Sequence, residues 1–309
     1  MDTVGFIGLG RMGQPMAANL AREGFTLRSF DLNGSGSCRS LAEAAKHAEV
    51  LITMLPDGAA VREAVLEALP SLPPGAIVVD MSSSDPAGTR ALGAALEARG
   101  VLMVDAPVSG AVAKAKDGTL SIMVGGTAAA LDRVRPVLAA MGREIFHVGP
   151  LGAGHAVKAL NNYIGAAGTL AGFEALLIAR AFRLDPKLML EAINASTGRN
   201  SATDRKIPQQ VLTGAFASGF KMGLMTKDVG IAAELARGLG LEMPFLKETL
   251  RMWREAQKKL SAAADHTEIY KYQQALAKRR SSAARRKPAP SRGAHARQSS
   301  SRRKRRRST

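Results

Sequence analysis

The sequence has one cysteine, no long apolar run and no metal-ligand spacing. Cys38 is the single cysteine among 309 residues, which excludes an internal disulfide framework and is typical of a reducing compartment. No uninterrupted apolar stretch approaches the ~18 residues that a membrane-spanning helix needs. The N-terminus also lacks the basic and apolar regions of a signal peptide. Histidines and cysteines nowhere take the spacing of a zinc site. These absences predict a cytoplasmic globular protein with neither a membrane segment nor a metal.

Acidic residues are missing from residues 278–309. This segment holds 14 of the 43 basic residues and no Asp or Glu. The other 29 basic residues face 26 acidic ones, so residues 1–277 have a net charge of only +3, against +17 for the whole chain. The segment is rich in Ser, Ala, Pro and Arg and has no apolar periodicity, which predicts a disordered tail. A solvated tail, an extended reading frame and salt-sensitive, non-specific contact with nucleic acid all fit it.

The remainder of the chain divides into two parts by its hydrophobic pattern. Short apolar runs, suited to buried parallel strands, alternate with helix-period segments in the first part and lie at residues 3–8, 26–30, 50–55, 76–81, 101–106, 121–125 and 144–149. The second part opens with one long apolar segment at 152–182 and shows no convincing strand. We therefore predict an α/β protein with a Rossmann-type, doubly wound parallel sheet over 1–150, an all-helical domain over 151–277 and the basic tail over 278–309.

A glycine-rich motif follows the first apolar run and opens a helix. The motif G-x-G-x-x-G is formed by Gly8, Leu9, Gly10, Arg11, Met12 and Gly13. The first glycine permits a tight turn, the second lets a pyrophosphate approach the backbone, and the third lets the helix pack closely on the strand. The N–H groups of the helix N-terminus then suit phosphates. In this context the motif predicts a dinucleotide-binding loop and not an ordinary turn.

Asp31 ends the second apolar run, 18 residues after Gly13. This is close to the ~20-residue offset at which an acidic residue binds the adenosine ribose hydroxyls. A carboxylate repels a 2′-phosphate, and no basic residue stands beside Asp31, so NAD is favoured over NADP. The alternative interpretation is a solvated aspartate in the turn DLNGSG.

Lys158 and Asn162 are four residues apart in the long apolar segment and therefore share one helix face. A lysine in such surroundings either has a partner or a catalytic task, or extends to solvent. Ser109 and Gly110 follow the fifth apolar run. A hydroxyl and exposed N–H groups suit a carboxylate there, although the same residues would make an ordinary turn.

Four segments together resemble the β-hydroxyacid dehydrogenase family. They are residues 5–20, 105–126, 149–162 and 227–232, and the resemblance runs in order over roughly residues 3–270. It implies a Rossmann-type domain followed by an all-helical domain. It also implies hydride transfer between nicotinamide and a small 3-hydroxy acid such as 3-hydroxyisobutyrate.

The resemblance implies roles for the four candidate substrate residues. Lys158 matches the family's catalytic lysine, and Asn162 matches the asparagine that helps to hold the substrate's hydroxyl or carbonyl. Ser109 and Gly110 match residues that grip the substrate carboxylate. Because an unperturbed lysine with a pKa near ~10.4 is a poor base at neutral pH, we expect burial and the cationic nicotinamide to lower the pKa of Lys158.

Further cofactor contacts follow from the same resemblance. Leu55 and Pro56 match a cofactor-contacting dipeptide. Ser84 stands where the family often has a threonine near the nicotinamide ribose. Lys227 matches a lysine beside the cofactor, with Asp228 as its structural support.

Two positions depart from the family's pattern. Ala111 replaces a second glycine after Gly110, and a positive φ at this position would cost alanine ~1 kcal/mol or more. Between Asp31 and Ser40 the chain has only a short turn, where relatives have a further helix and an edge strand. Weaker cofactor binding or a destabilised domain edge is the expected consequence.

Two rival functions remain after this comparison. Imine reductases share the scaffold, but Lys158 argues against that chemistry because such relatives usually carry another residue there. The other rival is a catalytically impaired scaffold that binds nucleic acid through its tail. The long apolar helix also predicts that the protein forms a homodimer or tetramer.

Overall fold

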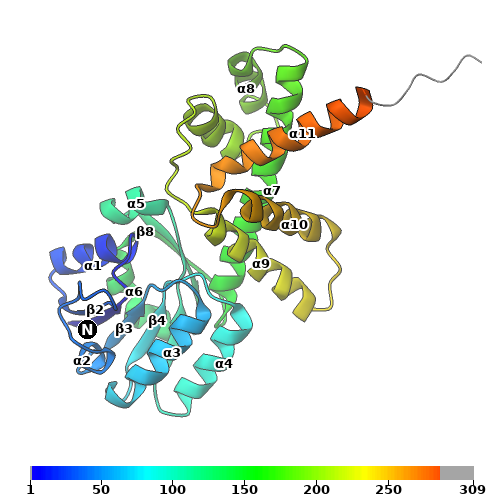
Figure 1. The fold of residues 1–309 in the computed structure, drawn as a ribbon. Helices are drawn as coiled ribbons and strands as arrows, with labels where there is room; N and C mark the ends of the chain where they lie inside the picture. Colours follow the sequence, from blue (N-terminus) through cyan, green and yellow to red (C-terminus); the bar gives the residue numbers. More distant parts are fainter. Residues whose placement is uncertain (1, 286–309) are drawn as a thin grey trace, which may run out of the picture.

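The computed structural model describes residues 2–285, with side chains described through residue 278. It shows a sheet domain followed by a helical domain (Figure 1). The predicted nucleic-acid contact falls mainly on residues 286–309, which lie outside the described residues. The last helix, α11 (Ile269–Arg285), continues past the tail boundary predicted at 277, and the domain boundary itself stays a prediction.

The sheet has eight strands in the order β2-β1-β3-β4-β5-β7-β6, and β8 pairs with β7. The strands are β1 (Thr3–Ile7), β2 (Thr26–Phe30), β3 (Val50–Thr53), β4 (Ile77–Asp80), β5 (Leu102–Asp105), β6 (Val108–Ser109), β7 (Leu120–Gly125) and β8 (Gly142–Gly149). The first five are parallel, whereas β7 runs antiparallel to β5 and β6. The Rossmann-type sheet is confirmed, with a mixed edge that includes the unpredicted short strand β6.

Helices cover both faces of the sheet because each strand buries side chains alternately on its two sides. The helices are α1 (Gly13–Arg22), α2 (Leu41–Ala45), α3 (Gly58–Ala68), the 3₁₀ turn η1 (Leu69–Ser71), α4 (Pro86–Glu97), α5 (Ala111–Asp117) and α6 (Ala128–Ala139). One core cluster joins the sheet to α1 and α6, and a second joins it to α2, α3 and α4. This double winding brings the loops after β1, β3, β4 and β5 to the carboxyl edge of the sheet.

The second domain is helical, as predicted, within the part of the chain that the structure describes. Its elements are α7 (Ala153–Ala181), α8 (Pro186–Asn194), the π-helix η2 (Ala202–Val211), α9 (Met222–Gly238), α10 (Pro244–Leu260), the 3₁₀ turn η3 (His266–Glu268) and α11. They pack around a single core that includes the fully buried Phe173 and Trp253. The π-helix, a geometry frequent at functional sites, was not predicted.

α7 connects the two domains. Its first turns contact β7 and β8, and its later turns contact α9, α10 and α11 (Figure 1). By length and composition the helix could cross a membrane, and 44% of its most apolar window is buried inside the protein. The central helix of a globular domain meets the same criteria.

The shortened segment after Asp31 contains neither a strand nor a helix before α2. It folds back along β2, the outer strand of the sheet. The Cys38 N–H donates to the Ser29 carbonyl at 2.8 Å, and the Ser29 N–H donates to the Ser37 hydroxyl at 3.0 Å. The turn therefore provides hydrogen-bond partners for backbone groups on the outer edge of β2. The sequence did not indicate this pairing. Its effect on cofactor binding stays a prediction.

Candidate active site

The glycine motif forms the turn between β1 and α1. Gly8 has a φ of +99°, and a Cβ there would lie 2.4 Å from the Met54 carbonyl oxygen. A Cβ on Gly13 would lie 1.8 Å from the Gly8 carbonyl oxygen, so close packing of helix on strand requires glycine at both positions. A Cβ on Gly10 would point into open space. The space beside Gly10 is therefore open, and the pyrophosphate contact expected from the motif's spacing stays a prediction.

The other three residues of this loop make contacts beyond it. The Leu9 N–H donates to Asp31 Oδ2 at 2.6 Å, which places the Asp31 carboxylate beside the loop, as binding of the adenosine ribose requires. The exposed Arg11 guanidinium donates to the Gly219 carbonyl at 3.2 Å and so reaches the helical domain. Met12 is half-buried against the sheet core. Asp31 Oδ1 also accepts the Asn33 N–H at 2.9 Å within its own turn, so the ribose contact of this carboxylate stays a prediction.

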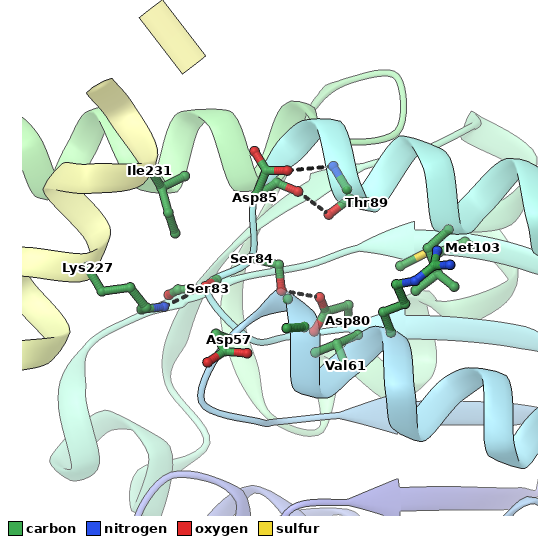
Figure 2. A pocket seen from close by; sticks show the side chains of 15 residues that line it. Asp57, Val61, Asp80, Ser83, Ser84, Asp85, Thr89, Met103, Lys227 and Ile231 are labelled. Atoms are coloured by element: carbon green, nitrogen blue, oxygen red, sulfur yellow. Dashed lines mark hydrogen bonds between the residues drawn. The ribbon is translucent and has the colours of Figure 1, made fainter. Parts of the chain in front are cut away.

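A hydrogen bond joins the loop after β3 to the loop after β4. Leu55 is half-buried and donates its N–H to the Ser82 hydroxyl at 2.9 Å, and Pro56 is exposed beside it. The Ser84 hydroxyl is buried and donates to Asp80 Oδ2 at 2.6 Å (Figure 2). Ser84 thus points into the protein, and the expected ribose contact through its hydroxyl stays a prediction.

Lys227 and Asp228 enter the site from α9. The Lys227 ammonium donates to the Ser83 carbonyl at 2.6 Å, so it reaches the loop after β4 (Figure 2), and it pairs with Asp228 Oδ1 at 3.1 Å. Asp228 Oδ2 accepts a hydrogen bond from the Asn162 side-chain amide at 2.5 Å. The aspartate therefore supports Lys227, as expected, and also orients Asn162.

Lys158 lies in the second turn of α7, partly buried at the carboxyl edge of the sheet. Its ammonium donates to the Val108 carbonyl at 2.7 Å. Burial lowers the pKa of Lys158 below its ordinary value, the Asp228 carboxylate opposes this shift, and the Lys227 ammonium adds to it. A lowered pKa of Lys158 is the shift expected for a lysine that acts as a general base.

Ser109 and Gly110 lie immediately after Val108, the residue that Lys158 contacts. Ser109 is in β6, and Gly110 has a φ of +141°. Ala111 takes a φ of +57°, the left-handed conformation that makes its methyl group costly. The strain predicted at the substituted glycine is therefore present. The backbone turn leaves both Ser109 and Gly110 half-buried next to the lysine.

Asp105 and His155 also shape the site, although the sequence interpretation gave neither a role. The Asp105 carboxylate accepts hydrogen bonds from the N–H groups of Gly152 and His155, both at 2.7 Å. α7 has no side-chain cap of its own, so Asp105 caps the helix that carries Lys158. A carboxylate at the end of a buried strand, followed by the Ser109 turn, was the available signal.

A cavity of about 290 Å³ lies between α3, α4 and α9. Ser84 and Lys227, two of the predicted site residues, line it together with Asp57 and Asp85 (Figure 2). A groove of about 670 Å³ continues from it along α9 and α10 and shares Asp85 and Lys227. The two domains therefore enclose open space beside the loop after β4.

Two family models match the chain. Residues 3–149 match the NAD binding domain of 6-phosphogluconate dehydrogenase, and residues 152–273 match the NAD-binding model of NADP-dependent 3-hydroxyisobutyrate dehydrogenase. The fold and the glycine loop thus define an NAD(P)-dependent oxidoreductase.

Curated relatives agree with these matches. The chain is 38% identical over 255 residues to 2-(hydroxymethyl)glutarate dehydrogenase of Eubacterium barkeri, covering 78% of this chain and 84% of the relative. It is 38% identical over 290 residues to NAD-dependent L-serine dehydrogenase of Pseudomonas aeruginosa, covering 88% and 97%. Among solved structures, 3-hydroxyisobutyrate dehydrogenase of Mycobacterium tuberculosis with L-serine superposes with a TM-score of 0.84 at 33% identity, covering 88% of this chain and 99% of that one. The chain belongs to the β-hydroxyacid dehydrogenase family.

Proposed function

We propose that the chain oxidises a small 3-hydroxy acid with NAD and that Lys158 is the general acid/base. The observation that carries this proposal is the position of Lys158. Its ammonium contacts Val108, the residue before Ser109 and Gly110, while Asn162 lies one turn further along the same face of α7. The contact of Lys158 with the residue before Ser109, and the shared helix face of Lys158 and Asn162, support these roles.

Each of these residues has a defined task in the proposed reaction. When bound, the nicotinamide supplies the hydride acceptor. Neutral Lys158 Nζ takes the proton of the substrate hydroxyl as the carbinol carbon loses hydride, and in reverse the ammonium returns it. The Asn162 amide, fixed by Asp228, holds that hydroxyl. The Ser109 hydroxyl and the Gly110 N–H donate to the substrate carboxylate.

The preference for NAD rests on Asp31. Its carboxylate lies within hydrogen-bond distance of the Leu9 N–H at the glycine loop, where the adenosine ribose of a dinucleotide is bound. A 2′-phosphate at this place would meet a negative charge. The relative from Pseudomonas aeruginosa is NAD-dependent by name, whereas one matching family model is named for an NADP-dependent enzyme.

The substrate class rests on the shared chemistry of the relatives' named substrates. 3-Hydroxyisobutyrate, L-serine and 2-(hydroxymethyl)glutarate all carry a CH₂OH group on the carbon next to a carboxylate. Hydrogen-bond donors for the carboxylate at Ser109 and a general base for the hydroxyl at Lys158 suit this arrangement. The group on the α carbon is what distinguishes the three acids.

Initial rates with a substrate panel test the proposal. The panel is 3-hydroxyisobutyrate, L-serine, 2-(hydroxymethyl)glutarate and 3-hydroxypropionate, each with NAD and with NADP. We expect NADH formation with at least one acid, higher kcat/KM with NAD than with NADP, and loss of turnover in Lys158→Ala. Lys187→Ala, on the exposed face of α8, is the matched control. Turnover by Lys158→Ala at the wild-type rate would contradict the assignment.

We further propose that the protein is a cytoplasmic homo-oligomer. Large apolar side chains are exposed at Ile164 and Ile178 of α7 and at Phe182, its C-cap residue, with exposed fractions of 68%, 69% and 77%. Such exposed apolar side chains are unfavourable in water unless another surface covers them. Light scattering of the wild type should give a dimer or tetramer mass, and Ile178→Lys should lower it. A monomeric wild type would contradict the proposal.

A further inference from the structure

Two exposed lysines flank the buried residue of α5, the short helix that follows the turn after β6. Ala115 is buried against the sheet core, and its carbonyl accepts a hydrogen bond from the Asn19 side chain at 2.8 Å, so α5 is held beside α1 (Figure 1). Lys114 and Lys116 are exposed on either side of Ala115. Among the described residues, neither ammonium has an acidic partner or a hydrogen-bond acceptor.

The side chain of Lys114 lies over Gly110. A Cβ on Gly110 would lie 2.6 Å from both Cβ and Cδ of Lys114 and 3.0 Å from its Cγ. The three nearest atoms outside the adjacent residues thus all belong to this one side chain. The lysine stem takes the place that a side chain on Gly110 would need. Because only two covalent bonds separate Cδ from Nζ, the ammonium lies beside the turn formed by Ser109 and Gly110.

This turn offers hydrogen-bond donors that no described protein group uses. The Ser109 hydroxyl and the Gly110 N–H have no acceptor within the part of the chain that the structure describes. Both are neutral donors. They can fix the direction of a carboxylate, but they bring no positive charge to it.

The other lysines of the site are engaged elsewhere. Lys158 has to be neutral when it accepts the proton of the substrate hydroxyl. The Lys227 ammonium pairs with Asp228 at 3.1 Å and donates to the Ser83 carbonyl at 2.6 Å. Lys114, in contrast, presents an unpaired ammonium beside the turn.

We propose that Lys114 binds the carboxylate of the hydroxy acid over the Ser109–Gly110 turn and so selects negatively charged substrates. The inference rests on the proposed function, in which this turn receives the carboxylate. The ammonium supplies the opposite charge, and the two neutral donors set the orientation. Since the carboxylate keeps its charge throughout the reaction, Lys114 stabilises the bound substrate and the transition state alike, and therefore acts on KM more than on kcat.

Initial rates of Lys114→Met and Lys116→Met test this assignment. Each substitution removes one exposed positive charge from the same helix, but Lys114 is the one that lies over the turn. The substrate is the acid of the panel that the wild type oxidises with the highest kcat/KM.

We expect Lys114→Met to raise KM for this acid about three- to tenfold, because a charge-assisted hydrogen bond is weakened by solvent at an exposed site. kcat should stay within about twofold of the wild-type value. Lys114→Arg keeps the charge and should restore most of the affinity, and Lys116→Met should leave KM unchanged. An unchanged KM in Lys114→Met, or an equal rise in Lys116→Met, would overturn the proposal.

The amide of the same acid separates the effect of charge from loss of the lysine stem. The wild type should prefer the acid to its neutral amide, and Lys114→Met should reduce this preference by the factor by which KM rises. Added salt should raise KM of the wild type more than that of Lys114→Met. A preference for the acid that Lys114→Met leaves unchanged would overturn selection by charge.

Calorimetric titration of the NADH-loaded protein with the acids of the panel requires no turnover and separates the two proposals. Acids that bind more weakly to Lys114→Met but are not oxidised by the wild type would support the role of Lys114 and contradict the proposed function. Oxidation by the wild type, with KM and Kd unchanged in Lys114→Met, would support the function and overturn the role of Lys114. Binding of none of the acids would overturn both.

Discussion

The side-chain amide of Asn162 and the carboxylate of Asp228 form a 2.5 Å hydrogen bond that ties α7 to α9. The other oxygen of Asp228 pairs with Lys227. One buried carboxylate therefore connects the residue proposed to hold the substrate hydroxyl with the lysine that reaches the loop after β4. Because Asp228 also interacts electrostatically with Lys158, its charge acts on the proposed base.

The two charges near Lys158 predict opposite shifts of the pH–rate profile. Asp228 raises the pKa of Lys158, and Lys227 lowers it. Oxidation requires neutral Lys158, so the rate should increase with pH through this pKa. Asp228→Asn should therefore move the rising part of the pH–rate profile to lower pH, and Lys227→Met should move it to higher pH. Both shifts are expected whatever each substitution does to the maximal rate. Shifts in the same direction, or no shifts, would show that deprotonation of Lys158 does not cause the rise of the rate with pH.

Ala111 predicts a stabilising substitution beside the proposed substrate carboxylate. Its φ of +57° costs alanine ~1 kcal/mol relative to glycine. Ala111→Gly should thus raise the free energy of unfolding by about 1 kcal/mol and lower KM for the hydroxy acid. Urea denaturation and initial rates measure the two effects.

Ala113→Gly is the matched control for that substitution. Ala113 lies within the same short helix, α5, and is exposed. Glycine there should destabilise by about 1 kcal/mol. Stabilisation by both substitutions, or by neither, would contradict strain at Ala111.

The sequence predicted those parts of the fold and site that depend on local spacing. The run of strands and the position of α7 follow from apolar periodicity, and the glycine motif predicts the turn that Gly8 and Gly13 form. Lys158 and Asn162 share a helix face because four residues make about one turn.

The remaining features depend on contacts between distant segments. Asp105 caps α7 across 47 residues, and His155 meets Asp80 only when β4, β5 and α7 are assembled. The sequence shows a carboxylate at the end of β5, but it does not show which distant group either contact joins. The two-residue strand β6 and the π-helix η2 were missed because short or irregular elements carry too little periodicity.

Lys206, in the π-helix η2, predicts a pH-dependent stability. Its ammonium donates to the Thr169 hydroxyl at 2.7 Å, and burial lowers the pKa of Lys206 to about 8. The unfolded chain, with the ordinary value of 10.5, binds more protons between these values, so the stability due to this group rises as the pH increases from about 8 to 10.5.

Lys206→Met tests that dependence. At pH 7 the variant should be more stable than the wild type, by no more than a few kcal/mol because part of the side chain is exposed. The difference should shrink as the pH approaches 10.5. Exposed Lys258→Met serves as the control, and the same pH dependence in both variants would contradict a special role for burial of Lys206. Chemical denaturation at a series of pH values measures it.

Asp31 predicts the cofactor preference. Asp31→Ser removes the charge that opposes a 2′-phosphate and also weakens the bond to the Leu9 N–H. kcat/KM should fall with NAD, and the NADP-to-NAD ratio should rise about tenfold or more. Asp185→Ser, at the exposed N-cap of α8, is the control and should leave the ratio unchanged. A ratio that does not change in Asp31→Ser would place the ribose contact elsewhere.

The most direct test of Lys158 as the general acid/base is a rescue experiment. Lys158→Ala is saturated with NAD and the hydroxy acid that the wild type oxidises, and NADH formation is followed with and without added methylamine. The account predicts normal NAD binding, a rate lowered at least about a hundredfold, and partial recovery in proportion to the free amine. Wild-type NADH formation by Lys158→Ala without amine would contradict it.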